Sequence, residues 1–417
     1  MNQSFYTGIT GLSSSQFAID VVSDNLSNLN TVGFKSSEAE FASIYNSSLD
    51  RASSSNLSAL TGAGTKIQAT SVNLSQGEII SGDRNTELAI DGDGWFGVKG
   101  NGETEYTRNG NFTFDASRDL VTQERQHVLG TLGGNIQDGV LTETLSSVAL
   151  GDVNAQKPLN LPESLHYPVE ATKNASFSGN LGIEEILVKA SSTVISSSSD
   201  LNALNLAFTQ SDPQPDIGSS WDIVATVTNA DGTTTYDTQN GVVTFGANGG
   251  LENFTLAALD NDGTAVNVDF GEGSSGLIAI DNQLVSISSS ADGFEAGELV
   301  GYTINEDANI IAGFSNGRSS SIGKVALYHF QNDQGLDKLS GSRFTESSNS
   351  GKPIFFTDAN GKNINGSTIL NYHLENSNVR VEVGLTDLII MQRAYDANSK
   401  TISTSDQMLQ KALQMDA

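Results

Sequence analysis

The strongest constraint on the fold is a helical repeat of apolar residues at each end of the chain. Near the N-terminus, apolar residues recur mostly at steps of three, four and seven: Phe5, Ile9, Leu12, Ile19, Val22, Leu26 and Leu29. The same steps recur near the C-terminus at Val381, Leu385, Leu388, Met391, Tyr395, Ile402, Leu409 and Leu413. Such spacing gives a helix one apolar face. The sequence therefore predicts a long helix at each end of the chain.

The two predicted helices are expected to pair along these apolar faces. Each segment spans roughly 30 residues, which is about 45 Å of helix. Polar residues stand near several core positions, at Gln16, Ser23, Asn30, Asn398 and Ser405. Polar core positions weaken a coiled coil, but they can fix its register. An antiparallel pair with the rest of the chain projecting from it is the expected arrangement.

The middle of the chain has the signals of β-structure. All Asn-Gly and Asp-Gly pairs lie between Asp91 and Gly366, and such pairs suit tight hairpin turns. Around Trp221, apolar and polar residues alternate with the period of a half-buried strand. A stretch rich in Ser, Thr, Gly and Asn, from about 191 to 301, could be a flexible linker. Its aromatic residues favour a folded β domain instead: Trp221, Phe245, Phe254 and Phe270.

Charge and composition exclude several classes of function. The 417 residues include 21 basic and 49 acidic ones, a formal charge of −28, so nucleic acid is not an expected partner. No apolar run approaches the roughly 20 residues of a membrane span. The first basic residue is Lys35, so the positively charged start of a cleaved signal peptide is missing. Cysteine is absent, which excludes disulfides and thiolate sites.

Two glycine-rich motifs suggest ligand sites, but the flanking residues favour turns. Gly92, Gly94 and Gly97 form a GxGxxG, yet a strand-like segment follows where a dinucleotide site needs a helix. We interpret that segment as a hairpin. A calcium loop starting at Asp91 would have Trp95 at its fifth position, where an oxygen ligand is required. The similar segment at 260–263 would begin at Ala258 and is interpreted as a turn as well.

No catalytic or metal site is recognisable in the sequence. The four histidines are too far apart to share a metal with a neighbour: His127, His166, His329 and His373. No GxSxG nucleophile motif is present. We therefore expect no catalytic residue, no metal and no cofactor, and a chain that is not an enzyme.

Four groups of segments, in chain order, resemble the flagellar rod, hook and hook-associated family. The first group is 23–35, and the second joins 76–77, 88–96 and 106–112. The third joins 313–317 and 330–336, and the fourth joins 374–379, 392–400 and 406–409. The residues that carry the terminal motifs are Asn25, Asn28, Thr31, Gly33, Phe34, Lys35, Ser377, Asn378, Val379, Gln392, Arg393 and Tyr395. Family members usually have glycine turns where this chain has 117–119 and 124–126, which leaves those hairpins open.

The resemblance and the patterns together predict a mainly β fold with α-helical termini that pair as a coiled-coil-like core. Two β domains are expected to be nested between the helices, with residues 313–373 returning to complete the inner one. The expected divisions are a helical core at 1–35 and 374–417, an extended connector at 36–70, an inner β domain at 71–145 and 313–373, and an outer β domain at 146–312.

The resemblance implies a structural subunit of the flagellar hook, a flexible tube that carries torque from the rod to the filament. It implies that the chain polymerises with itself and meets rod, hook-cap and hook–filament junction proteins. It also implies export by the flagellar type III apparatus, without a cleaved signal peptide, to a position outside the cell. The alternatives are a distal rod protein, a secreted β-domain adhesin and, with no recognisable site, a secreted hydrolase.

Overall fold

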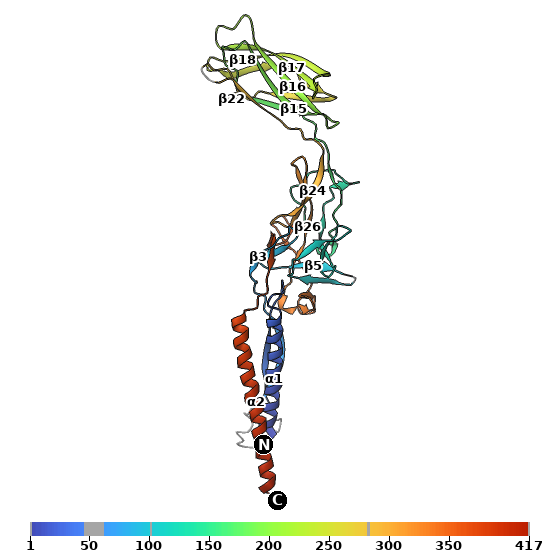
Figure 1. The fold of residues 1–417 in the computed structure, drawn as a ribbon, viewed down its shortest axis with the longest axis vertical. Helices are drawn as coiled ribbons and strands as arrows, with labels where there is room; N and C mark the ends of the chain where they lie inside the picture. Colours follow the sequence, from blue (N-terminus) through green and yellow to red (C-terminus); the bar gives the residue numbers. More distant parts are fainter. Residues whose placement is uncertain (1, 46–61, 101, 282–283, 416–417) are drawn as a thin grey trace.

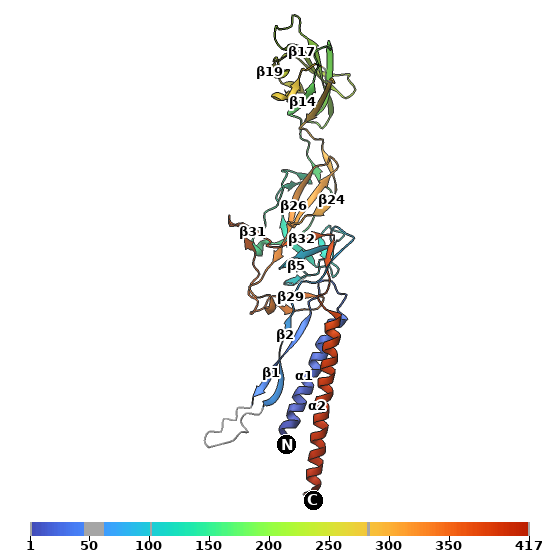
Figure 2. The same cartoon turned by 90° about the vertical axis from the view of Figure 1, so that its left-hand side faces the viewer.

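The computed structural model describes residues 2–45, 62–100, 102–281 and 284–415. These residues form three parts stacked along one long axis (Figures 1 and 2). We call them the shaft, the inner unit and the outer unit. The shaft holds the helices α1 (Asn2–Ser27) and α2 (Val381–Met415). In the described ranges, all the remaining secondary structure apart from two short 3-10 helices is β. The predicted fold class, mainly β with paired terminal helices, is confirmed.

The two helices of the shaft run antiparallel, because their contacts advance in opposite directions along the chain. Ser4 lies opposite Ser405, with the two Oγ atoms 3.4 Å apart. At the other end of the shaft, a Cβ added to Gly384 would lie 3.0 Å from Cδ2 of Leu26. The first residues of α1 therefore face the last turns of α2, as the apolar repeats predicted.

A long hairpin lies along α1, within the expected connector 36–70. Its strands are β1 (Ser37–Tyr45) and β2 (Gly62–Val72), which pair antiparallel. The part of the connector at 46–61 lies outside the described residues. Asn25 fixes the start of the hairpin through two hydrogen bonds with the backbone of Ser37, of 2.8 and 2.9 Å. Figure 2 shows α1 between this hairpin and α2.

The inner unit is built on a 15-stranded sheet and three strand pairs. The sheet runs β10-β11-β13-β24-β25-β26-β9-β5-β6-β29-β28, and the strand pairs are β3 with β33, β4 with β32 and β30 with β31. Its first set of strands is β3 (Ile79–Ser81), β4 (Leu88–Asp91), β5 (Trp95–Lys99), β6 (Thr104–Thr107), β7 (Phe112–Phe114), β8 (Leu120–Thr122), β9 (His127–Leu132), β10 (Ile136–Gln137), β11 (Val140–Leu141), β12 (Lys157–Pro158) and β13 (His166–Tyr167).

A second set of strands returns to the same unit from the C-terminal half. They are β24 (Gly297–Ile304), β25 (Asn309–Phe314), β26 (Ser319–Val325), β27 (Leu327–Tyr328), β28 (Asp337–Lys338), β29 (Arg343–Thr345), β30 (Phe356–Thr357), β31 (Asn363–Ile364), β32 (Thr368–Asn371) and β33 (His373–Glu375). Short 3-10 helices occur at Val153–Ala155 and Asp333–Gly335.

The outer unit is a separate ten-stranded sheet that curls around its own apolar core. Trp221, Phe245 and Phe270 are buried there, and Phe254 packs on Phe270 with ring centroids 5.2 Å apart, as the aromatic residues predicted. Its strands are β14 (Asn174–Asn180), β15 (Leu187–Ile195), β16 (Leu201–Gln210), β17 (Ser219–Asn229), β18 (Thr235–Phe245), β19 (Gly250–Thr255), β20 (Leu259–Asn261), β21 (Thr264–Asp269), β22 (Gly273–Ile278) and β23 (Ser286–Ala291).

The sheet of the outer unit is shorter than the expected outer domain at 146–312. It begins at Asn174 and ends at Ala291, whereas the flanking strands belong to the inner sheet. β13 pairs with β24, and β24 pairs in turn with β25. These pairings bury side chains such as Leu165 and Ile310 in the inner core. The flanks of the insertion are thus structural members of the inner unit.

The glycine-rich segment at 91–97 contains no helix. A dinucleotide site requires a helix at this point, so the segment does not form one. Gly92 and Gly94 have φ angles of 112° and 120°, and they join β4 to β5. The hairpin interpretation was wrong in one respect, because β4 pairs with β32 and β5 pairs with β6. The turn therefore carries the chain from one sheet to another.

The turns that lack the family's glycines are hairpins in this chain too. β7 pairs with β8, and β8 pairs with β9. Arg118 and Arg125 take the positive φ that glycine would supply, each at 63°. In the first turn, Oδ1 of Asp115 accepts hydrogen bonds from the backbone N–H groups of Ser117 and Asp119, at 2.8 and 2.9 Å. Such side-chain bonds stabilise a tight turn without glycine.

Candidate functional site

The face of α2 toward α1 follows a regular alternation of three- and four-residue steps. Ten of the twelve half-buried positions of α2 follow these steps: Val381, Gly384, Leu388, Met391, Tyr395, Asn398, Ile402, Ser405, Leu409 and Ala412. We call this row the seam. It is the heptad pattern of a coiled coil. Small and polar residues occupy four of its ten positions, so the seam is narrow and only partly apolar.

Glycines let the two helices approach closely at the middle of the seam. A Cβ added to Gly8 would lie 2.8 Å from Cγ1 of Ile402, and one added to Gly11 would lie 2.7 Å from Oδ1 of Asn398. Larger residues at these positions would push the helices apart. Glycine inside a helix costs about 1 kcal/mol relative to alanine, and the close approach of the two helices offsets that cost. The close approach thus fixes the register of α1 against α2.

The structure divides the predicted polymerisation core into two sets of residues. Most are half-buried in the shaft: Phe5, Leu12, Ile19, Val22, Leu26, Leu29, Leu388, Met391, Tyr395, Ile402 and Leu409. Ile9, Leu385 and Leu413 are exposed instead. Leu385 and Leu413 are not on the seam, because its steps place Gly384 and Ala412 there.

Helix α2 leaves a large apolar surface in contact with solvent. None of the 35 residues of α2 is buried among the described part of the chain. The exposed apolar residues of α2 are Val383, Leu385, Ile389, Ile390, Met408, Leu413 and Met415. These residues form two groups, one at 383–390 near the inner unit and one at 408–415 at the other end of the helix. Exposed apolar groups on a soluble chain mark interaction surfaces. The shaft therefore has the surface that a neighbouring subunit would cover.

A buried ion pair joins the shaft to the inner unit. Nζ of Lys35 lies 2.7 Å from Oε1 of Glu375, and both side chains are 1% exposed. Nζ of Lys35 also donates to the carbonyl of Ser75 at 2.8 Å, and the amide of Gly77 donates to Oε1 of Glu375 at 2.9 Å. Burial lowers the pKa of Lys35, and the charge of Glu375 opposes that shift. With Arg108 3.3 Å from the other carboxylate oxygen, Glu375 has partners on both oxygens.

The amide side chain of Asn378 connects the segment before α2 to two other segments of the chain, at Ser36 and at 73–75. Its Oδ1 accepts from the backbone N–H of Ser36 at 2.8 Å. Its Nδ2 donates to the carbonyls of Asn73 and Ser75 at 2.8 and 3.0 Å. An asparagine is suited to this role because it offers a donor and an acceptor at once. Asn378 and Asn25 therefore tie both helices to the base of the hairpin.

Gly33 occupies a position where the structure leaves no room for a side chain. Its φ is 67°, and an added Cβ would lie 2.4 Å from the backbone nitrogen of Asn109. Its amide donates to the carbonyl of Glu375 at 2.7 Å. Beside it, Phe34 is buried under Nζ of Lys338, which lies 4.3 Å from the ring centroid. The family motif is thus explained by close packing at the junction.

The remaining motif residues fall into three places. Asn28 and Thr31 close the end of α1, where Oγ1 of Thr31 donates to Oδ1 of Asn28 at 3.1 Å. Oγ of Ser377 accepts from the amide of Val379 at 3.3 Å, just before α2 begins. Gln392 and Arg393 are exposed on α2, away from the junction.

Sequence analysis did not single out Glu375 and Arg108, which complete the junction. Both lie inside or beside the segments of family resemblance, but a lone charged residue carries no periodic signal. Lys35 is buried in the junction, whereas basic residues are almost always exposed. Within the described ranges, no three His, Asp or Glu side chains gather to hold a metal ion. None of the described helices is long and apolar enough to cross a membrane.

Comparisons with known proteins agree with this architecture. Residues 5–35 match the flagella basal body rod protein family, and residues 370–415 match the flagellar basal body rod FlgEFG protein C-terminal family. Residues 89–165 match the flagellar hook protein FlgE/F/G D1 domain. These matches define an axial protein of the bacterial flagellum, with rod-type ends and a hook-type inner unit.

Full-length relatives specify the type of axial protein. The flagellar hook protein FlgE of Borreliella burgdorferi is 26% identical over 100% of both chains. The FlgE of Escherichia coli is 26% identical over 97% of this chain and 98% of its own. The chain belongs to the flagellar hook protein family. It is a structural protein and not an enzyme.

A solved structure supports the fold independently. The crystal structure of Helicobacter pylori flagellar hook protein FlgE2 superposes on 71% of this chain and 100% of its own, with a TM-score of 0.54. The sequences are only 16% identical, so this likeness concerns the fold alone.

Proposed function

We propose that this chain polymerises into the tubular hook of the flagellum, with the shafts forming the inner wall and the outer units facing outward. The observation that carries this proposal is helix α2, whose 35 residues include none that are buried within the described chain. The exposed apolar residues near both ends of α2 are stabilised when neighbouring shafts cover them. Contacts that repeat head to tail without closing produce a helical polymer.

The junction supports a mechanical role for the polymer. Torque carried by the tube has to pass between shaft and inner unit, and the buried Lys35–Glu375 pair crosses that boundary. Two short segments, 168–173 and 292–296, connect the outer unit to the inner unit along the chain. We infer that the inner layers carry load while the outer units shift relative to one another as the tube bends.

The partners and the export route belong to the same proposal. The rod-type terminal segments support contact with rod proteins at one end of the hook, and with hook-cap and junction proteins at the other. We infer export through the flagellar type III apparatus to the outside of the cell. A distal rod protein is the second candidate, favoured by the rod-type matches. The full-length hook relatives favour the hook.

Electron microscopy of the purified chain under assembly conditions tests the proposal. Tubes of uniform diameter are expected, and they should curve or straighten with solvent conditions. A chain that stays monomeric at all concentrations, with its helices fully protected from hydrogen exchange, would contradict polymerisation through the shaft.

A further inference from the structure

We propose that the last two turns of α2 bind a groove at the opposite end of the shaft of a second copy of this chain. This inference rests on the proposed polymerisation and names the surfaces that hold one axial row of subunits together. We call residues 408–415 the overhang.

The overhang extends beyond the helix that covers the rest of α2. Ser405 lies opposite Ser4, and α1 begins at Asn2. The eight residues from Met408 continue the helix by about 12 Å at 1.5 Å per residue, and Figure 1 shows α2 projecting past α1. Met408, Leu413 and Met415 are 61%, 72% and 84% exposed. The overhang thus exposes three large apolar side chains, while Leu409 and Ala412 on its seam side stay half-buried.

A groove with apolar walls lies at the other end of the shaft, between α1, β1 and the start of α2. Its volume is about 470 Å³. Ala18 and Gly384 also line it, and neither has a long side chain to fill the space. The apolar lining residues are Val21, Val22, Phe41, Val379, Val383 and Met391. Polar residues of the junction, among them Asn25 and Asn378, line the rest of the groove.

The two surfaces match in length and in charge. The helical part of the groove lining runs from the start of α2 at Val381 to Met391, about 15 Å of helix at 1.5 Å per residue. Two turns of a second helix fit within that length. Glu38 and Asp387 line the groove with a single opposing cation, Arg380. Lys411 is the only charged residue of the overhang, so its charge complements the groove.

The positions of these surfaces select a second copy as the occupant. They lie at opposite ends of one rigid shaft, so a chain cannot fill its own groove. A contact between different surfaces of identical subunits propagates in a line without closing. The helix from Leu385, beside the groove, to Lys411 in the overhang is about 39 Å long. Subunits in the resulting row should therefore repeat at about 40 Å along the shaft direction.

Cross-linking between two single-cysteine variants tests the contact directly, because the chain has no cysteine of its own. Val383→Cys marks the groove wall and Leu413→Cys marks the overhang. We expect a short bis-maleimide reagent to join them into a two-chain product when the two variants are assembled together. The matched control pairs Leu413→Cys with Ile389→Cys, which is 60% exposed on α2 but outside the groove.

A charge reversal gives an independent measurement. Lys411→Glu should raise the critical concentration for assembly by up to about fivefold, the effect of one exposed charge pair. Adding Asp387→Lys in the same chain should restore assembly. Lys400→Glu reverses an exposed charge on the same helix, outside both surfaces, and should have a smaller effect.

The outcomes separate this inference from the proposed function. Failure of the unmodified chain to form any polymer would overturn both. Normal tubes in which the groove and overhang cysteines react no more than the control pair would overturn the docking alone. Normal tubes whose assembly is insensitive to Lys411→Glu would do the same.

Discussion

Lys35 and Glu375 lie 340 residues apart in the chain, yet their side chains form a 2.7 Å ion pair that is almost closed to water. Lys35 follows α1, and Glu375 comes shortly before α2. The pair therefore holds both ends of the chain at the point where the shaft meets the inner unit. Glu375 also accepts a hydrogen bond from the amide of Gly77 and lies beside Arg108. Removal of its charge therefore affects its own segment and the three that contain Lys35, Gly77 and Arg108.

Substitution of Glu375 by Gln should destabilise the inner unit by about 3–5 kcal/mol, because it leaves Lys35 buried without a counter-charge. Urea unfolding followed by tryptophan fluorescence measures the loss. Glu346→Gln removes the partner of an exposed lysine, Lys352, and should leave the unfolding midpoint unchanged. Equal midpoints for both variants would show that the buried pair contributes little.

Substitutions at Leu388 and Leu385 should separate pairing within the shaft from contact between subunits. Leu388 lies on the seam, and Leu385 is 48% exposed. Aspartate at either position should prevent assembly, because burying an unpaired charge costs several kcal/mol. Only Leu388→Asp should also speed hydrogen exchange along α1 in the monomer. Tubes formed by Leu385→Asp would show that this face stays uncovered in the polymer.

Removal of the outer unit should preserve tube formation only if the cut follows the sheet boundaries. Deletion of 174–291 leaves β13 and β24 to pair, and its ends are close because Asp292 Oδ1 accepts from the amide of Lys173 at 2.9 Å. A short Gly/Ser linker should close that gap at little cost. We expect straighter tubes in electron micrographs.

The wider deletion of 146–312 provides the contrast. It removes Leu159, Leu165, Tyr167, Ile304 and Ile310 from the inner core. Loss of even one buried leucine costs about 2–5 kcal/mol, so this variant should not fold. Circular dichroism and proteolysis distinguish the two deletions. A folded inner unit after the wider deletion would overturn the boundaries drawn from the strand pairing.

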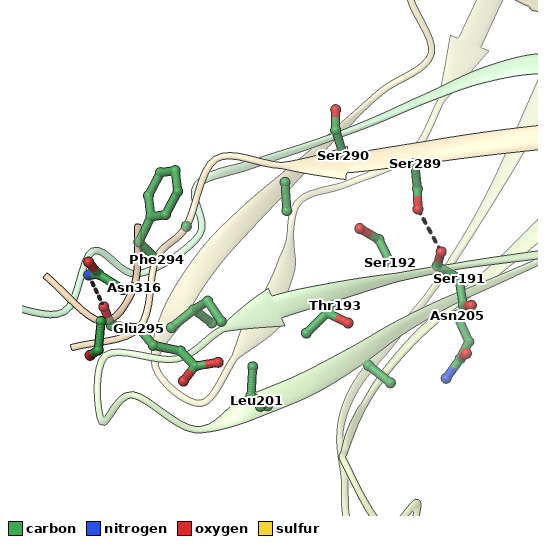
Figure 3. A pocket seen from close by; sticks show the side chains of 15 residues that line it. Ser191, Ser192, Thr193, Leu201, Asn205, Ser289, Ser290, Phe294, Glu295 and Asn316 are labelled. Carbon is green, nitrogen blue, oxygen red and sulfur yellow. Dashed lines mark hydrogen bonds between the residues drawn. The ribbon is translucent and has the colours of Figure 1, made fainter. Parts of the chain in front are cut away.

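Arg318 should control how firmly the outer unit is held above the inner one. Its guanidinium lies 4.2 Å from the ring centroid of Phe294 and 3.6 Å from the carboxylate of Glu170, which are paired in the linking segments. Figure 3 shows Phe294 beside a polar cleft of about 770 Å³, with Asn316 of the inner unit donating to the carbonyl of Glu295. The cleft is lined by residues of the outer unit, of the link and of the inner unit, so it lies where the two units meet.

Substitution of Arg318 by Ala should speed amide exchange at Glu170 and Phe294 several-fold, matching a loss of about 1 kcal/mol for an exposed cation–π contact. Hydrogen exchange read by mass spectrometry measures the change. Arg393→Ala, on the exposed face of α2, is the matched control and should leave these amides unaffected. Unchanged exchange in Arg318→Ala would mean that backbone pairing alone holds the link.

His329 should make the inner unit less stable in mild acid. Burial lowers the pKa of His329, and Arg108 adds to the shift, whereas its contact with Asn365 and the charges of Asp93 and Asp333 oppose it. With the folded pKa below the unfolded value of about 6.5, stability is full above that pH. It is lost as the pH falls through the lowered folded pKa.

Measuring the free energy of unfolding at several pH values between neutral and mildly acidic tests this sign. The amide introduced by His329→Gln can still donate to the carbonyl of Asn365, which His329 Nε2 contacts at 2.5 Å, and the substitution should flatten the dependence. His166→Gln changes an exposed histidine of β13 and should not. A steeper acid loss in the His329→Gln variant than in the unmodified chain would reverse our assignment.

The sequence predicts the elements whose pattern is local. The apolar repeats indicated both helices, and the alternation around Trp221 agrees with its buried pattern in β17. The sequence did not predict which residues lie on the seam. Gly384 and Ala412 are small, so the apolar pattern favoured their neighbours Leu385 and Leu413. Close helix contact at a glycine depends on the partner helix, which lies nearly 400 residues away.

The limits of the outer unit and the junction could not be predicted for a related reason. Turn signals mark where strands end, but they do not show which strands pair. The pairing of β13 with β24 could therefore not be predicted from the sequence. The family resemblance located Lys35 and Asn378 but gave no partner for either. Each bonds to a segment more than 300 residues distant, and one sequence contains no local trace of such contacts.

The nesting of the three parts has a consequence for the order in which the chain folds. Only the outer unit is continuous in sequence, so its hairpins form by closing short loops. The inner unit must bring together strands on either side of it, and the shaft must join the two ends of the whole chain. Contacts between distant residues form slowly, because loop closure costs entropy first. We expect a chain that starts unfolded to acquire protection from the tip inward and to complete its shaft last.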